Sequence, residues 1–140
     1  MAYRLFDHTA DIGIEASGET FADALADAAR GLGEVVTGRQ ISYDAAEPLQ
    51  FQIEAPDEES LIVAFLSELL WLLESTGILW CSGGVTVVAG GPGWILDADA
   101  NGVAYDPIRH GVGTEIKAIT YHDLSVVRKK QVTLRVILDI

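Results

Sequence analysis

The spacing of apolar residues divides the start of the chain into strands followed by a long helix. Residues 3–6 could begin a strand, and in 12–16 apolar side chains occupy every second position, the period of a half-buried strand. From 21 to 36 they recur at three- and four-residue steps, which is the period of an amphipathic helix. Thr20 is placed to cap this helix and Gly38 to end it.

A second helix is predicted from Asp57, a capping residue, to Gly77, which ends it. Its apolar surface, concentrated in 61–73, extends well round the helix, so we expect other elements to cover it on more than one side. Further strands, several of them separated by glycine turns, are predicted at 41–43, 49–53, 78–82, 85–89, 94–98, 115–121, 124–127 and 132–139. Two helices packed on a largely antiparallel sheet indicate an α+β two-layer sandwich in a single domain, residues 1–140.

Composition and charge narrow the classes of function. The chain has 140 residues, 49% of them hydrophobic, and a net charge of −12, which disfavours direct binding of nucleic acid. The dense basic run 128–130 is interpreted as a solvated hairpin tip, with a docking patch as the alternative. The single cysteine, Cys81, lies in an apolar stretch and is expected to be a buried thiol. With no evident signal peptide or membrane span, we expect a cytoplasmic protein.

Acidic residues near the two ends of the chain are the candidates for chemistry. Carboxylates held about 4 Å apart repel by roughly 4 kcal/mol at an effective dielectric near 20, so a cluster takes up protons or binds a hard cation. Asp7 and Asp11 lie about 13 Å apart in an extended chain, so the segment must bend if both bind one ion. Capping of a turn is the alternative for these two. For Asp139 the alternative is a frayed, solvated strand end, and Arg135, about 13 Å along the strand, is too far away to pair with it.

A second group of candidates surrounds the segment 115–122. Lys117 could contact a phosphate or a carboxylate of a partner, or it could be an ordinary strand lysine. In a regular strand Lys117 shares a face with Tyr121, and His122 projects to the other side. The three histidines, His8, His110 and His122, show no recognisable metal-ligand spacing, so a histidine metal site is the less favoured interpretation.

Three segments together resemble the archease family across nearly the whole chain. They are Asp7-His8-Thr9-Ala10-Asp11-Ile12-Gly13, Glu115-Ile116-Lys117-Ala118-Ile119-Thr120-Tyr121-His122 and the closing Asp139-Ile140. Each is moderately specific alone, and their order and spacing make the resemblance strong. One departure is the compact hairpin 128–132, where many relatives carry a longer tip with tryptophan, and it concerns only contacts made by that hairpin.

The resemblance implies an accessory protein rather than an enzyme. Such a protein activates the RtcB-type RNA ligase of tRNA splicing by promoting its guanylylation and multiple turnover. The resemblance also implies a divalent metal ion, with calcium expected and magnesium or manganese as alternatives, bound by Asp11, Asp139 and the terminal carboxylate of Ile140. With the ligase as partner, no direct, specific binding of nucleic acid is expected. The candidate residues for activating the partner are Lys117, Asp7, His8 and His122.

Two other functions stay open at the level of sequence. One is a metal-dependent phosphoester hydrolase with Asp7, Asp11, His122 and Asp139 around a catalytic ion. The other is a generic chaperone-like binding domain. Hydrolysis of model phosphoesters by the pure protein would favour the first of these.

Overall fold

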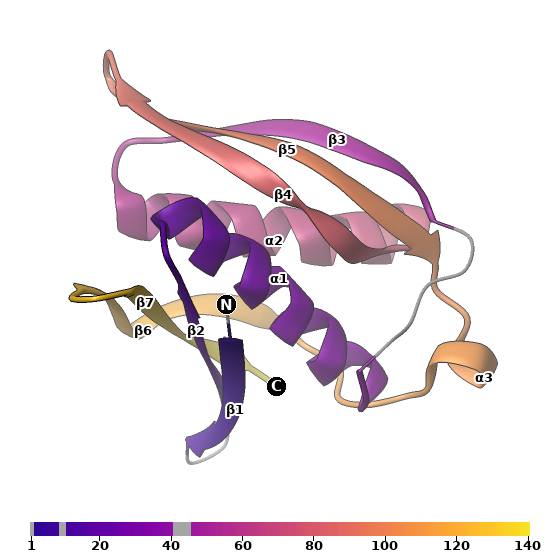
Figure 1. Cartoon of the computed structure of the whole chain (residues 1–140). Coiled ribbons are helices and arrows are strands. Elements are labelled where there is room, and N and C mark those ends of the chain that lie inside the picture. Colours follow the sequence, from indigo (N-terminus) through magenta and orange to yellow (C-terminus); the bar gives the residue numbers. More distant parts are fainter. Residues whose placement is uncertain (1, 9–10, 41–45) are drawn as a thin grey trace.

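Two antiparallel sheets enclose two long helices (Figure 1). The computed structural model describes residues 2–8, 11–40 and 46–140, and for residues 7 and 8 the backbone alone. The four-stranded sheet has the order β1-β2-β7-β6, and the three-stranded sheet has the order β3-β5-β4. The bounds are β1 Ala2–His8, β2 Asp11–Gly18, α1 Phe21–Thr37, β3 Glu47–Ala55, α2 Glu58–Thr76, β4 Ile78–Gly90, β5 Gly93–Ala104, α3 Pro107–His110, β6 Ala118–Arg128 and β7 Val132–Asp139.

Capping residues fix the ends of both long helices where the sequence predicts them. The Thr20 hydroxyl accepts from the Asp23 amide at 3.1 Å to begin α1, and Gly38 ends it with φ 78°. The Asp57 carboxylate accepts from the Ser60 amide at 2.7 Å to begin α2, and this bond lowers the pKa of Asp57. Gly77 ends α2 with φ 75°. Both helices are therefore confirmed.

The helices form the middle layer of the molecule. α1 packs against β1, β2 and β7 on one side and β4 on the other, while α2 packs against β3, β4 and β5 on one side and β6 on the other. The prediction that α2 is covered on more than one side is confirmed. The α+β class with antiparallel strands is confirmed as well. The predicted arrangement in two layers differs from the structure, because the strands divide into two sheets and the helices lie between them.

Other differences concern individual elements. The predicted strands 78–82 and 85–89 are one strand, β4, whose register shifts between Trp80 and Ser82. The predicted strands 115–121 and 124–127 are likewise one strand, β6, which begins only at Ala118 and has a register shift between Thr120 and Ser125. The sequence predicts a turn at Gly83-Gly84 and a break between 121 and 124, but in both places the strand continues and pairs again beyond the irregularity. The short helix α3 was not predicted, and the predicted strand 41–43 lies outside the described residues.

Two sequence-based expectations outside the candidate site, for Cys81 and for the hairpin tip, can be compared with the structure. Cys81 is 2% exposed, its thiol donates to the Asn101 carbonyl at 3.2 Å, and burial raises its pKa, which confirms a buried thiol. Lys129 and Lys130 lie in the exposed hairpin tip between β6 and β7, as predicted, whereas Arg128 is the last residue of β6 and its guanidinium group donates to the Glu58 carboxylate. In the described part of the chain, no helix is both long and apolar enough to cross a membrane.

Candidate metal site where β2 and β7 meet

The last strand of the chain lies in the interior of the four-stranded sheet. β7 pairs with β2 on one side and with β6 on the other, so it is not a frayed end. Leu134, Val136 and Leu138 are fully buried and belong to the core. Because side chains alternate along a strand, Asp139 and Arg135 lie on the other face, which the helices do not cover.

The register of β2 against β7 brings the two predicted acids together. Asp11 lies directly opposite Asp139, Gly13 opposite Ile137 and Glu15 opposite Arg135. Directly opposite residues of an antiparallel pair share a face and have Cβ atoms about 4.5–5.5 Å apart. The Asp11 and Asp139 side chains therefore extend from neighbouring positions on the outer face of the sheet. Asp139 is exposed and Asp11 is half-buried.

Neighbouring elements hold the end of β7 in place. The Lys117 amide donates to the Asp139 carbonyl at 2.8 Å, and the Thr120 hydroxyl donates to the Ile137 carbonyl at 2.9 Å. Ala118 is the register partner of Asp139 on this side. Lys117 is exposed, and the hydrogen bond from its amide holds its backbone beside Asp139. The fold thus gathers Asp11, Asp139, Ile140 and Lys117 at one end of the sheet.

The structure says less about the other residues predicted to activate a partner, Asp7, His8 and His122. In β1 the backbone of Asp7 pairs with Ile12 and that of His8 pairs with Asp11, but the side chains of Asp7 and His8 lie outside the description. His122 lies further along β6, past the residue that pairs with Ile137, with its Nε2 3.3 Å from an Asp123 carboxylate oxygen. The strand is irregular there, and Asp123 has φ 51°, so a regular alternation does not place His122.

His110 belongs to a separate part of the fold. It is buried in α3, its ring stacks on Tyr105 at 6.1 Å between centroids, and its Nδ1 accepts from the Asp106 amide at 3.0 Å. His110 therefore carries its hydrogen on Nε2 when it is neutral. The three histidines belong to different elements, His8 to β1, His110 to α3 and His122 to β6.

The donor set at the end of the sheet fits a hard divalent cation. Its described candidate ligands, the side chains of Asp11 and Asp139, both offer carboxylate oxygens. Calcium, magnesium and manganese prefer such ligands, whereas zinc prefers nitrogen and sulfur. Among the described side chains, those of residues 2–6, 11–40 and 46–140, no three from His, Cys, Asp or Glu lie close enough together to hold a metal ion. The two aspartates alone make the described nucleus of the site.

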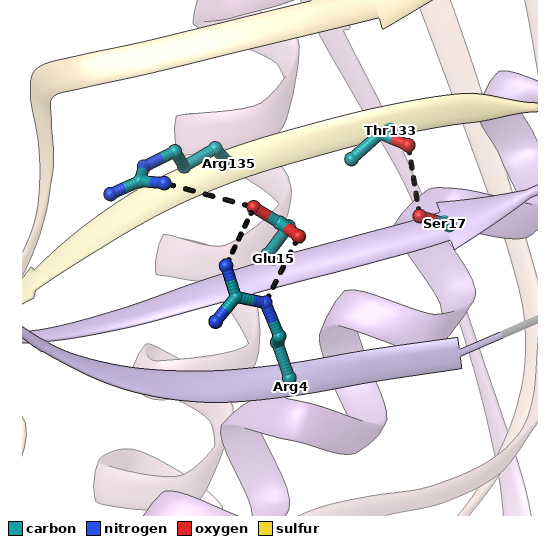
Figure 2. A network of polar contacts seen from close by, with 5 residues as sticks. All are labelled: Arg4, Glu15, Ser17, Thr133 and Arg135. Atoms are coloured by element: carbon teal, nitrogen blue, oxygen red, sulfur yellow. Dashed lines mark hydrogen bonds and ion pairs between the residues drawn. The ribbon is translucent and has the colours of Figure 1, made fainter.

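A network that sequence reasoning missed lies on the same face (Figure 2). The Glu15 carboxylate accepts from Arg4 Nε at 3.1 Å and from Arg4 Nη2 at 3.4 Å, and its Oε2 lies 3.7 Å from Arg135 Nη1. Next to it the Ser17 and Thr133 hydroxyls are 2.9 Å apart. The signal in the sequence was the alternation that places Glu15 on the same face as Asp11, but the register that brings Arg135 beside it comes from the fold.

Gly13 makes room for the aromatic ring that lies between the acid pair and this network. Phe6 is the register partner of Gly13, and a Cβ at Gly13 would overlap the Phe6 ring. We expect Gly13→Ala to lower the free energy of unfolding by about 1–3 kcal/mol, because the ring must leave its position. In a Phe6→Ala background the same substitution should cost much less, as urea unfolding of the four proteins would reveal. Equal costs in both backgrounds would contradict this account.

These observations define an α+β protein whose two long helices lie between antiparallel sheets and which carries an acid pair formed by its first and last segments. A family model described as the Archease protein family matches residues 3–140. The chain is 35% identical over 123 residues to protein archease of Pyrococcus furiosus, covering 88% of this chain and 86% of that one. It is 33% identical over 132 residues to protein archease of Methanopyrus kandleri, covering 92% and 91%. The chain belongs to the archease family.

Solved structures agree with this assignment. The solution structure of Methanobacterium thermoautotrophicum protein 1598 matches with a TM-score of 0.81 at 27% identity, covering 99% of this chain and 98% of that one. The crystal structure of a Thermotoga maritima protein, described as an archease and possible chaperone, matches with a TM-score of 0.59 at 24% identity, covering 100% and 98%. The second likeness concerns the fold alone.

Proposed function

We propose that this protein is an accessory activator of an RtcB-type RNA ligase, promoting guanylylation of the ligase and its multiple turnover in tRNA splicing. Membership of the archease family supports the proposal. The structural observation that carries it is the pairing of Asp11 with Asp139, which joins the family's two terminal acidic motifs in one place. In this proposal the protein performs no ligation itself.

The proposed metal site is formed by Asp11, Asp139 and Ile140, with calcium as the expected ion and magnesium or manganese as alternatives. A divalent cation bound there would supply the positive charge that cancels the repulsion between the carboxylates. The protein's own residues do the positioning. β7 is held on both sides, so the Asp139 carboxylate is presented from the interior of a sheet. Lys117, exposed beside it, is proposed to contact an anionic group of the ligase.

A guanylylation assay tests the proposed function. The cognate ligase is incubated with GTP, with and without this protein at about one tenth of the ligase concentration. We expect faster and more complete guanylylation and more than one ligation per ligase molecule, because an activator that is not consumed acts repeatedly. The protein alone should ligate no RNA. Equal ligase turnover with and without the protein would refute the proposal.

Two further assays of the purified protein distinguish the activator from the two alternative functions. Hydrolysis of a model phosphoester by the pure protein, abolished by a chelator, would favour the metal-dependent hydrolase instead. Suppression of aggregation of unrelated proteins, without any effect on the ligase, would favour the chaperone-like domain.

A further inference from the structure

The outer face of the four-stranded sheet carries charge in ordered rows. The row at one end pairs Asp11 with Asp139, and the middle row runs from Phe6 through Gly13 to Ile137. The row beyond it runs from Arg4 through Glu15 to Arg135, then to Ser125 of β6. The face is therefore acidic at one end, apolar in the middle and basic further along. We call the row of Arg4, Glu15 and Arg135 the arginine row.

The arginine row has more positive than negative charge. Its two guanidinium groups share the single Glu15 carboxylate, which is the only acid in the described residues with which they pair. A guanidinium group has five N–H donors in a planar fork, so one carboxylate cannot satisfy both groups. The row can accept a second carboxylate without losing the first.

The aromatic ring of the middle row holds the arginine side chains in position. The Arg135 guanidinium carbon lies 4.0 Å from the centroid of the Phe6 ring, and that of Arg4 lies 5.7 Å from it. Stacking on a ring leaves the N–H edges of a guanidinium group free to bond a carboxylate in its plane. Because the groups are already oriented, less conformational entropy is lost when a partner binds.

The row is also accessible. The Arg4 side chain is 63% exposed and that of Arg135 is 36% exposed. The labelled side chains in Figure 2 project from the side of the sheet opposite the helices, which lie behind it. The middle row between this row and the acid pair is more covered, since Ile137 is fully buried.

Charge is divided unequally between the two sheets. Most of the nine Lys and Arg residues of the chain lie in the strands of the four-stranded sheet or directly beside them: Arg4, Lys117, Arg128, Lys129, Lys130 and Arg135. Within their described bounds, β3, β4 and β5 contain no Lys or Arg, whereas β3 and β5 contain Glu47, Glu54, Asp97 and Asp99. The strands of the four-stranded sheet also contain acids, so its positive charge is confined to particular places, of which the arginine row is one; these acids are Asp7, Asp11, Glu15, Asp123 and Asp139.

We propose that the arginine row docks an acidic patch of a protein partner, whose carboxylates pair with Arg4 and Arg135 while the Asp11–Asp139 end faces the partner's reactive site. The partner is the ligase, so this inference rests on the proposed function. Arg135 and Asp139 are four residues apart in one strand, or about 13 Å, which fixes the partner's orientation. A protein suits the row better than RNA. A polyanion is repelled by the whole charge of the chain, whereas a local acidic patch is recognised within a Debye length of about 8 Å.

The test measures binding to the ligase by calorimetry at low and moderate salt. Arg135→Glu is expected to weaken binding at least tenfold, since it replaces an attraction with a repulsion at a positioned contact. Glu15→Gln is expected to tighten binding about threefold, because it leaves both arginines to the partner. Both effects should shrink as salt rises. Lys130→Glu at the hairpin tip changes the net charge as much as Arg135→Glu does, and it should alter affinity little.

The opposite effects of Arg135→Glu and Glu15→Gln on affinity distinguish a docking role of the arginine row from a purely structural one. If the arginine row served only to stabilise the sheet, Glu15→Gln would lower stability and would not tighten binding. Thermal unfolding accompanies each variant, and Arg135→Gln replaces Arg135→Glu if the latter does not fold. Unchanged affinity in Arg135→Glu or in its substitute, or equal weakening by Lys130→Glu, would overturn the proposal.

The binding experiment and the guanylylation assay can fail independently, so the docking proposal and the proposed activator function are tested separately. If the wild-type protein binds the ligase in an arginine-dependent way but does not stimulate guanylylation, the activator role fails and the docking surface stands. If stimulation occurs and the arginine variants bind normally, the reverse holds. If the variants instead change affinity for a single-stranded RNA and not for the ligase, the partner assignment is wrong.

Discussion

Replacing either aspartate of the terminal pair by asparagine is expected to abolish both the response of the protein to calcium and its stimulation of the ligase. Asp11 and Asp139 lie directly opposite each other in the β2–β7 register, and each supplies a carboxylate to the same proposed site. A ligand present at a hundred times its dissociation constant stabilises a folded protein by about 2.7 kcal/mol. We expect this stabilisation in the wild-type protein and little of it in Asp11→Asn or Asp139→Asn.

The metal-free proteins provide a second and independent result. Two carboxylates about 4 Å apart repel by roughly 1–4 kcal/mol at dielectric constants between those of water and a protein surface. Asparagine has nearly the shape of aspartate and no charge, so in a chelator Asp139→Asn should be at least as stable as the wild-type protein. If Asp139→Asn is at least as stable as the wild-type protein without metal but less stable with calcium, the Asp139 carboxylate serves to bind the metal and not to maintain the fold.

Thermal unfolding with chelator and with calcium measures both effects, and the guanylylation assay measures stimulation. The matched control is Asp99→Asn, which removes one carboxylate from β5 in the other sheet and should leave the calcium response unchanged. A full calcium response in both Asp11→Asn and Asp139→Asn would contradict the proposed site. Comparison of calcium with magnesium and manganese in the same experiment would identify the preferred ion.

Removing the ring of Phe65 is expected to cause a large loss of stability, about 3–5 kcal/mol. Phe65 of α2 is fully buried, and its ring lies 6.1 Å from that of Phe51 in β3 and 5.7 Å from that of Trp80 in β4. Phe65→Ala would leave a cavity between the middle layer and the three-stranded sheet. Since domains have total stabilities of about 5–15 kcal/mol, this single change would lower the unfolding temperature markedly.

A large aromatic residue on the same helix serves as the control. Trp71 is 57% exposed, so Trp71→Ala should change the free energy of unfolding by no more than about 0.5 kcal/mol. Urea unfolding of the two variants measures the contrast. Losses of similar size would show that α2 is not packed as described. Phe65→Ala should retain its response to calcium as long as it is folded, because the acid pair lies in the other sheet.

The sequence identified the residues of the candidate site and the strand faces on which they lie, but it did not predict which residues of β2 and β7 lie opposite one another. The alternation of apolar residues places Asp11 and Glu15 on one face of β2, and Asp139 and Arg135 on one face of β7. The sequence also excluded Arg135 as a partner of Asp139, and in the structure Arg135 pairs with Glu15 instead. That Glu15 was its partner could not be predicted, because a pairing register between the two ends of a chain leaves no local trace.

Helix ends and strand periods were determined by the sequence itself. Thr20, Gly38, Asp57 and Gly77 set the bounds of α1 and α2 through hydrogen bonds and backbone angles that depend on neighbouring residues alone. Only the tertiary structure decided that the strands divide into two sheets around the helices and that β7 lies between β2 and β6. Those choices depend on which apolar faces bury one another across the whole chain. They bring Asp11 and Asp139 together.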